Sequence, residues 1–175
     1  VVRRPVRSAD GGLGATNGYL RPGADVHIGW LPYTKRNVLT AMFKLLDTPY
    51  GWHGQDNKRD CVGVLRVVFR CMGIETGRAI TSASENLVPM DPKLSVAEKI
   101  AKVGAIEPVI TVVSSPDHTA LLLGRGGNGK IYFMHQGGWG YKENGEYLSV
   151  NRVSINHAEH PWFSISQPNL YTVMK

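Results

Sequence analysis

The sequence contains very little cysteine. Two of its 175 residues are cysteines, Cys61 and Cys71, whereas small domains held together by disulfides carry several pairs. If both lie on one helix, ten residues separate them by about 15 Å at a rise of about 1.5 Å per residue, which is too far for a disulfide bond. The sequence therefore predicts two free thiols, and we expect Cys71 to be buried in the core, as unpaired cysteines commonly are.

The sequence also lacks a long apolar run. No stretch is long enough to cross a bilayer, and none has the pattern of a secretory leader. We therefore expect no membrane span, and we expect any targeting segment to lie upstream of Val1. With 42% hydrophobic and 19% charged residues, the composition is that of a folded globular protein, and the length suits one domain with a small attachment.

Negative charge is scarcer than positive charge, and the net charge is +6. A basic surface suits an anionic partner, such as nucleic acid, anionic lipid or the acidic polymers of a bacterial wall. Proteins that follow nucleic acid often interleave basic and aromatic residues, and this pattern is absent. Apart from Arg3, Arg4 and Arg7, the basic residues are scattered along the chain. We therefore expect no nucleic-acid partner.

The order of the predicted elements indicates an α+β fold. A short β segment is predicted over residues 1–32, with extended runs at 1–7 and 18–31. In the main domain, 33–175, we predict helices at 34–46, 61–72 and 96–103, and strands at 107–114, 119–123, 130–135, 147–155 and 163–166. The glycine-rich residues 124–129 predict a hairpin turn between two of these strands. Helices followed by antiparallel strands are typical of α+β domains.

A candidate nucleophile lies at the start of the most apolar helix, 61–72. Asp60 is a natural N-cap for this helix because its carboxylate can accept a first-turn N–H. Cys61 then lies in the first turn, where unpaired N–H groups and the positive end of the helix dipole favour a thiolate. Taken alone, Cys61 is more often a core residue than a nucleophile.

Two histidines can complete a catalytic group with Cys61. His118 stands where a loop enters a strand, and His135 ends the next strand across the predicted hairpin. Neighbouring antiparallel strands lie about 4.8 Å apart, so the two imidazoles can be within hydrogen-bond reach. This pattern predicts a nucleophile, a base and a residue that orients the base, as in cysteine hydrolases. Taken alone, each histidine is more often a polar residue with satisfied hydrogen bonds than a catalytic residue.

One cysteine and two histidines can also bind zinc. Zinc sites usually show CxxC or HxxxH spacings together with a fourth ligand, and the sequence shows none of these. We therefore expect no metal and no cofactor.

Two aromatic segments flank the candidate group. Residues 50–54 form a glycine-hinged turn with Tyr50 and Trp52, and residues 136–141 are glycine-rich and contain Trp139. Each segment is either part of a substrate cleft or a loop packed on the core, and the sequence pattern does not separate the two.

Taken together, these segments resemble the nucleophile region of NlpC-type cell-wall peptidases. The resemblance rests on the aromatic turn 49–54, on 59–63 with its Asp-Cys pair, and on 69–74, where a helix ends in Gly-Ile. Residues 118–124 resemble the strand that carries the family's base, and 26–34 resemble the junction with an upstream bacterial Src-homology-3-like domain. The resemblance implies a papain-like NlpC fold, with N-terminal helices packed on an antiparallel β-sheet, preceded by the tail of that upstream domain.

NlpC-type peptidases cut peptidoglycan stem peptides, typically between γ-D-glutamate and a diamino acid. The resemblance therefore implies that Cys61 is the nucleophile, His118 the base and His135 the third polar residue. It implies an enzyme of the cell envelope, the periplasm or the secreted fraction. It also implies that Tyr50 and Asp60 hold the free amino end of the substrate. Trp52 and Trp139 are candidate contacts to the same substrate.

The sequence departs from the family pattern at three places. Val62 replaces the serine that usually follows the cysteine, His53 replaces a glycine, and residues 76–78 are Thr-Gly-Arg in place of Leu-Pro-Arg. These departures leave two alternatives open, a wall-binding module without activity and an acyltransferase of the same fold.

Overall fold

The computed structural model describes residues 2–77, 87–88, 90–91, 93–114, 118–137, 139–159 and 169–172. Its helices are α1 (Lys35–Phe43), the 3-10 helix η1 (Trp52–Asn57), α2 (Cys61–Arg70) and α3 (Val96–Gly104). Its strands are β1 (Val2–Arg7), β2 (Leu13–Gly18), β3 (Leu87–Val88), β4 (Thr111–Ser114), β5 (Thr119–Arg125), β6 (Ile131–Gln136), β7 (Trp139–Glu143), β8 (Glu146–Val150), β9 (Val153–His157) and β10 (Asn169–Thr172). The predicted α+β class is confirmed.

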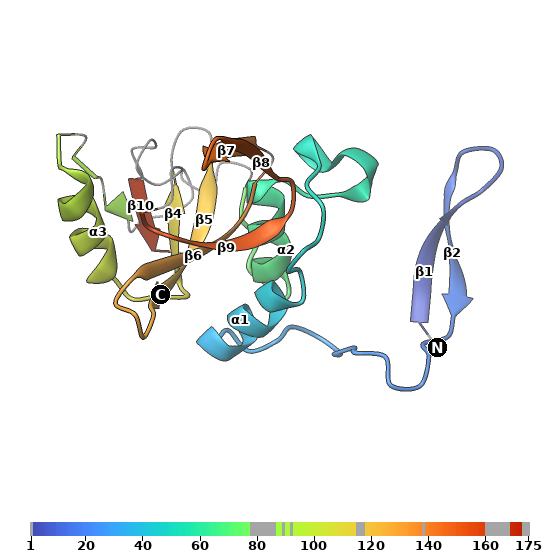
Figure 1. The fold of residues 1–175 in the computed structure, drawn as a ribbon. Helices are drawn as coiled ribbons and strands as arrows, with labels where there is room; N and C mark the ends of the chain where they lie inside the picture. Colours follow the sequence, from blue (N-terminus) through green and yellow to red (C-terminus); the bar gives the residue numbers. More distant parts are fainter. Residues whose placement is uncertain are drawn as a thin grey trace.

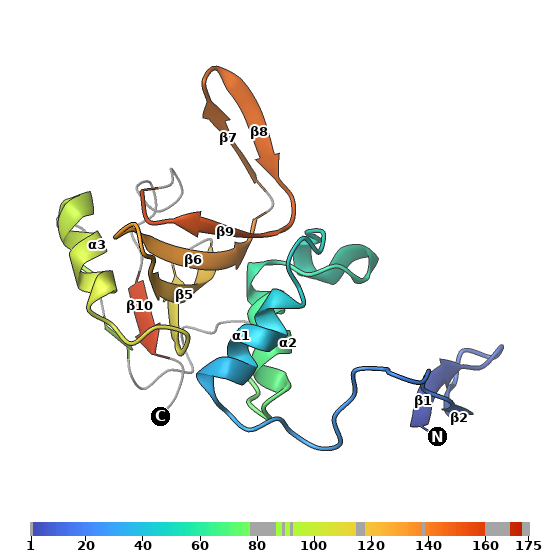
Figure 2. The same cartoon turned by 60° about the horizontal axis from the view of Figure 1, so that its bottom comes forward.

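Six strands form one antiparallel sheet in the order β3-β10-β4-β5-β6-β9, while β1–β2 and β7–β8 form two separate hairpins. Figure 1 shows α3 on one side of this sheet and α1 and α2 on the other. Figure 2 shows the β7–β8 hairpin extending away from the sheet. The predicted packing of N-terminal helices on an antiparallel sheet is therefore confirmed.

Within the described part of the chain, no helix has the length and apolar character that a bilayer crossing requires.

Each face of the sheet has its own hydrophobic core. On one face, Leu121 packs with Val64 of α2 and other fully buried side chains of α1 and α2. On the opposite face, Leu122 and Phe133 pack with Val103 of α3. Because successive side chains of a strand point to opposite faces, the adjacent residues Leu121 and Leu122 belong to different cores. The sheet is thus covered on both faces.

Local sequence signals place the helix starts correctly. At the start of α1, the Thr34 hydroxyl accepts the Asn37 N–H at 3.2 Å, and at the start of α3 Ser95 and Glu98 form a capping box. The predicted end of the first helix at residue 46 is wrong, because α1 ends at Phe43 and the chain then turns. The turning segment ends at a left-handed residue, Asp47, with a φ of 62°.

The N-terminal segment is a β-hairpin, but its second strand lies earlier than predicted. β2 pairs with β1 along its whole length, so the strand predicted at 18–31 is wrong. A tight turn at residues 8–12 lets the second strand begin at Leu13. Ser8 N–H donates to the Gly12 C=O at 2.9 Å, and the Asp10 carboxylate accepts the Gly12 N–H at 3.1 Å. Figure 1 shows this hairpin apart from the main domain, at the end of an extended segment.

The strand predicted at 147–155 is in fact two strands. β8 pairs with β7, whereas β9 joins the main sheet beside β6. The break includes Asn151, whose C=O accepts the Tyr50 N–H at 2.8 Å. The segment around Tyr50, which precedes α2, therefore contacts the chain between β8 and β9. The strand predicted at 163–166 lies outside the described residues, and β3, β7 and β10 were not predicted.

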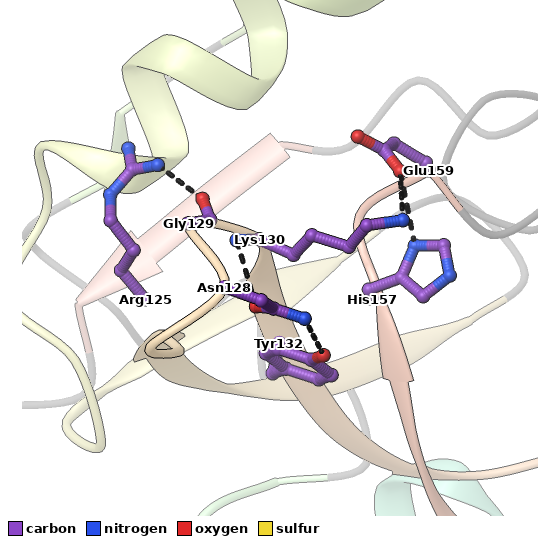
Figure 3. Close-up of polar contacts among 7 residues, drawn as sticks. All are labelled: Arg125, Asn128, Gly129, Lys130, Tyr132, His157 and Glu159. Carbon is purple, nitrogen blue, oxygen red and sulfur yellow. Dashed lines mark hydrogen bonds and ion pairs between the residues drawn. The ribbon is translucent and has the colours of Figure 1, made fainter.

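The glycine-rich segment 124–129 forms the predicted hairpin turn between β5 and β6. Figure 3 shows how side chains hold it. Asn128 Nδ2 donates to Tyr132 Oη at 2.8 Å, and Lys130 Nζ lies 2.6 Å from a carboxylate oxygen of Glu159. The second contact joins the turn to the chain that follows β9.

Cys71 is exposed, so the prediction that it belongs to the core is wrong. It follows α2 directly, its Sγ donates to the Val67 C=O at 3.2 Å, and its own C=O accepts the Leu31 N–H at 2.9 Å. Trp30 lies against Gly73, whose φ of 75° is that of a helix-ending glycine, as predicted. The extended N-terminal segment therefore binds the end of α2 without enclosing the thiol.

Candidate active site

Asp60 fixes the start of α2. Its side chain is 2% exposed, Oδ1 accepts the Gly63 N–H at 2.7 Å, and Oδ2 accepts the His53 N–H at 3.2 Å. The predicted N-cap is therefore confirmed, and the same carboxylate ties the loop of η1 to the helix. A Cβ at residue 63 would lie 3.0 Å from Oδ1, so glycine suits this close approach.

The thiol of Cys61 is nearly enclosed, since only 7% of the residue is exposed. Burial raises the pKa of the Cys61 thiol, backbone N–H groups of Thr119 and Val62 act to lower it, and the Asp60 charge adds to the increase. The loss of solvation outweighs the favourable position at the helix start. The expectation that the helix start favours a thiolate is therefore wrong, because the buried site favours the neutral thiol.

His118 and His135 form a direct hydrogen bond. Nε2 of His118 lies 2.9 Å from Nδ1 of His135, and the two rings meet edge to face at 89°. Both residues are buried, with 6% and 1% exposed. His135 pairs with Ala120 across β5 and β6, so the hairpin brings the two imidazoles together as the sequence predicted.

The buried environment keeps His118 uncharged. Burial, and then the neighbouring His135, lower the pKa of His118 to about 3. At neutral pH the Cys61 thiol and the His118 imidazole are therefore both neutral. A neutral imidazole carries one N–H and one unprotonated nitrogen, and the latter is able to accept a proton.

Asn156 extends the group beyond the two histidines, and the sequence analysis did not identify it. Its Oδ1 lies 2.7 Å from Nε2 of His135 and also accepts the Ser154 hydroxyl at 3.1 Å. Ser154 is directly opposite His135 across β6 and β9. The signal in the sequence was weak, because Ser154 lies in the predicted strand 147–155 whereas Asn156, two residues further and on the same face of β9, lies just beyond it.

α2 packs on β5 and β6, and Cys61 is the first residue of α2. The backbone of Thr119 lies near enough to the Cys61 thiol to act against the rise in its pKa, and Thr119 directly follows His118 in the chain. The structure thus places the Cys61 thiol near the residue that follows His118. Nucleophilic catalysis by cysteine requires a base next to the thiol, so the contact of the sulfur with the His118 imidazole stays a prediction.

The other predicted site residues lie on the neighbouring segments. Tyr50 is partly buried and forms a β-bridge with Arg59, while Trp52 is 55% exposed and packs on the His53 ring with centroids 4.8 Å apart. Trp139 begins β7, and its side chain lies outside the described part of the chain. Tyr50 and Trp52 therefore flank the start of α2, whereas the contact predicted for Trp139 stays a prediction.

A groove of about 270 Å³ runs along α2 next to this end of the helix. Its charged lining has an excess of positive charge, with four cationic side chains, Lys58, Arg59, Arg66 and Arg70, against the carboxylates of Asp60 and Glu75. Arg70 forms an ion pair with Glu75 at 2.9 Å, and Arg66 donates to the Thr76 C=O at 3.0 Å. The groove suits an anionic group.

Among the described residues, no three or more His, Cys, Asp or Glu side chains are grouped so that they could hold a metal ion.

Solved structures of NlpC/P60 proteins have a similar fold. A novel NlpC/P60 endopeptidase from Photobacterium damselae subsp. piscicida matches 98% of this chain with a TM-score of 0.70 and 19% identity, over 45% of its own length. An NlpC/P60 family protein from Bacillus cereus matches 83% of the chain with a TM-score of 0.55 and 15% identity, over 42% of its own length. The P60 domain of a Mycobacterium avium subspecies paratuberculosis antigen matches 81% of the chain, over 95% of its own length, with a TM-score of 0.52 and 15% identity.

The chain thus spans less than half the length of the first two of these proteins. No protein-family model matches the sequence, and no curated protein matches it. The similarity therefore lies in the three-dimensional structure, across most of the chain. On that evidence, the chain has the fold of the NlpC/P60 endopeptidase domains.

Proposed function

We propose that the chain is a cysteine peptidase that hydrolyses peptidoglycan stem peptides, of the type that cuts between γ-D-glutamate and a diamino acid. The observation that carries the proposal is the buried His118–His135 hydrogen bond, together with a buried thiol at a helix start near Thr119, the residue that follows His118. The NlpC/P60 endopeptidase fold supports the choice of substrate. The basic groove along α2 suits the carboxylates that such peptides carry.

In the first half of the reaction, His118 accepts the Cys61 proton while the sulfur attacks the peptide carbonyl carbon. The electron pair of the C=O bond moves to the oxygen, and N–H groups at the start of α2, including that of Cys61, stabilise the resulting oxyanion. Collapse of this intermediate breaks the C–N bond. His118 gives its proton to the leaving amine, and a thioester remains on Cys61.

In the second half, water attacks the thioester and gives a proton to His118. The C–S bond breaks, the carboxylic acid product leaves, and the sulfur takes the proton back. His135 keeps the ring of His118 in one orientation through both halves by means of the 2.9 Å hydrogen bond. Because the resting thiol is neutral, proton transfer accompanies the attack instead of preceding it.

Substrate contacts are assigned to the segments that border Cys61. The free amino end of the peptide lies near Tyr50 and the negative charge of Asp60, whose oxygens also cap α2. The exposed ring of Trp52 forms one wall of the cleft, and Trp139 is a further candidate contact to the peptide. In this proposal the enzyme acts in the cell envelope, in the periplasm or after secretion, and residues 1–32 are the tail of an upstream Src-homology-3-like domain.

A second candidate is a wall-binding module of the same fold without activity. The raised pKa of the Cys61 thiol favours this alternative, because a neutral thiol is a weak nucleophile until a base removes its proton. Both candidates bind the same peptides, so binding alone does not separate them.

Hydrolysis of purified wall fragments tests the proposal. The unmodified protein and the Cys61→Ala variant are incubated with stem peptides, and the products are identified by mass spectrometry. We expect peptide fragments that have gained water, and we expect none with the variant. A folded unmodified protein that binds the peptides without cutting them would contradict the proposal, and transfer of the acyl group to an amine would identify an acyltransferase.

A further inference from the structure

We propose that Asn156 is a positioning residue that sets the proton arrangement of both histidines and thereby leaves His118 able to act as a base. This inference rests on the proposed function for its catalytic consequence. The arrangement itself concerns only three hydrogen-bonded side chains. No prediction from the sequence included Asn156.

The position of Asn156 follows from the sheet. Asn156 and Ser154 are two residues apart on β9, so both lie on the face that carries His135 of β6. The amide oxygen of Asn156 accepts two hydrogen bonds, one from His135 Nε2 at 2.7 Å and one from the Ser154 hydroxyl at 3.1 Å. An amide oxygen has two lone pairs, so these two donors use its full capacity. The amide is therefore held with its oxygen toward His135.

The amide oxygen determines which nitrogen of His135 carries the proton. Because that oxygen can only accept, Nε2 of His135 must carry a hydrogen. Nδ1 of a neutral His135 is then an acceptor, and its hydrogen-bond partner, Nε2 of His118, must be the donor. A neutral His118 with its proton on Nε2 has an unprotonated Nδ1. The three hydrogen-bonded side chains thus leave a lone pair on Nδ1 of His118, the ring nitrogen that does not bond to His135.

The opposite orientation of the Asn156 amide would reverse the direction of both hydrogen bonds between these three side chains. If the Asn156 NH2 group faced His135, Nε2 of His135 would accept, and Nδ1 of His135 would donate to His118. Nδ1 of a neutral His118 would then carry the proton and could not take another from Cys61. A wrong tautomer is costly, since loss of the residue that fixes it lowers kcat by about 10⁴-fold in a serine protease triad.

Matched variants test the role in catalysis. Asn156→Leu keeps a similar volume and removes the acceptor, so we expect kcat to fall by about 10- to 100-fold, as for other residues that orient a histidine, with little change in KM. Asn156→Asp keeps the acceptor and adds a negative charge, so we expect it to retain most of the kcat. The added charge stabilises the imidazolium, so the acid limb of the pH profile of kcat/KM should move to higher pH. Ser154→Ala is the control and should have a smaller effect than Asn156→Leu.

Each variant is compared with the unmodified protein by thermal unfolding, so that a loss of structure is not taken for a loss of positioning. Equal kcat in the unmodified protein and a folded Asn156→Leu variant would overturn the proposal. Equal losses in Asn156→Leu and Asn156→Asp would overturn it too, because a positioning role requires that the acceptor rescue activity.

The ¹⁵N chemical shifts of the imidazole nitrogens test the proton arrangement without any substrate. They distinguish Nδ1–H from Nε2–H tautomers, and we expect the Nε2–H tautomer for both His118 and His135 in the unmodified protein. In Asn156→Leu we expect His135 to shift toward the other tautomer. An Nδ1–H tautomer of His135 in the unmodified protein overturns the proposal even in an active enzyme. If the shifts are as expected and no wall peptide is cut, the proposed function fails while the proton arrangement stands.

Discussion

The main domain and the N-terminal segment differ in how far their apolar side chains are buried. In the main domain, Val64 and Leu65 of α2 are 0% exposed and lie between α1 and the sheet. In the N-terminal segment, Leu13, Tyr19 and Ile28 are 81%, 85% and 99% exposed. Because isolated hairpins are marginally stable and gain little from burial, the stability and the chemistry of the chain both depend on the main domain. The N-terminal segment contributes exposed apolar and basic surface.

The sharpest form of this comparison sets the two cysteines against each other. Cys61→Ala removes the proposed nucleophile, so hydrolysis of stem peptides should fall by about 10⁴-fold or more. Cys71→Ala changes an exposed thiol at the other end of the same helix and should leave kcat/KM within about twofold. Initial rates by chromatography check both. Loss of activity in Cys71→Ala would contradict the assignment of the chemistry to one end of α2.

The contrast in burial should appear directly in stability. Leu65→Ala creates a cavity between α2 and the sheet, and we expect a loss of about 2–5 kcal/mol in the free energy of unfolding. Leu13→Ala removes an exposed side chain of the hairpin, and the change should stay within about 0.5 kcal/mol. Urea denaturation followed by circular dichroism gives both values. Similar losses would show that the hairpin contributes to the core.

Acid should destabilise the main domain through His118. The unfolded chain takes up a proton on this residue near pH 6.5, whereas in the folded state the pKa of His118 is about 3. The stability that depends on the neutral ring is therefore complete above pH 6.5 and is lost as the pH falls toward 3, by at most about 1.4 kcal/mol per pH unit. In His118→Gln this part of the pH dependence should be missing. His27→Gln, at an exposed position of the N-terminal segment, should keep the pH dependence of the unmodified protein.

A smaller effect is expected at the cap of α2. Asp60→Ala removes the acceptor for the Gly63 and His53 N–H groups, and we expect a loss of about 1–2 kcal/mol. Asp56→Ala is the matched control because that carboxylate is exposed and lies 3.5 Å from Lys58, and its loss should cost less than about 1 kcal/mol. Equal effects in chemical denaturation would mean that the cap of α2 is no more important than a surface ion pair.

Features that depend on residues close together in the sequence could be predicted from it. The caps Thr34, Asp60 and Ser95 were predictable because a cap depends on residues within one turn. The meeting of His118 and His135 was predictable because a short hairpin places one strand beside the next. Each of these features rests on local sequence or on a single turn.

Features that depend on distant contacts were missed. The break between β8 and β9 coincides with a hydrogen bond between Tyr50 and Asn151, which are far apart in the sequence. The neutral state of Cys61 depends on how completely the sheet and helix enclose it, and the helix position alone predicted the opposite. Asn156 required the register of β6 and β9, which a predicted strand with the wrong bounds does not provide.

The attachment of the extended segment to Cys71 and Gly73 has a mechanical consequence. The Leu31–Cys71 hydrogen bond and the Trp30 ring bind the C-terminal end of α2, about 15 Å of helix away from the thiol. A pull on the N-terminal segment is therefore borne by the Asp25–Lys44 ion pair with the residue after α1 and by the end of α2, and not by the residues around Cys61. The tether can be lengthened, exchanged or anchored to a surface while the geometry at the opposite tip of the helix stays the same.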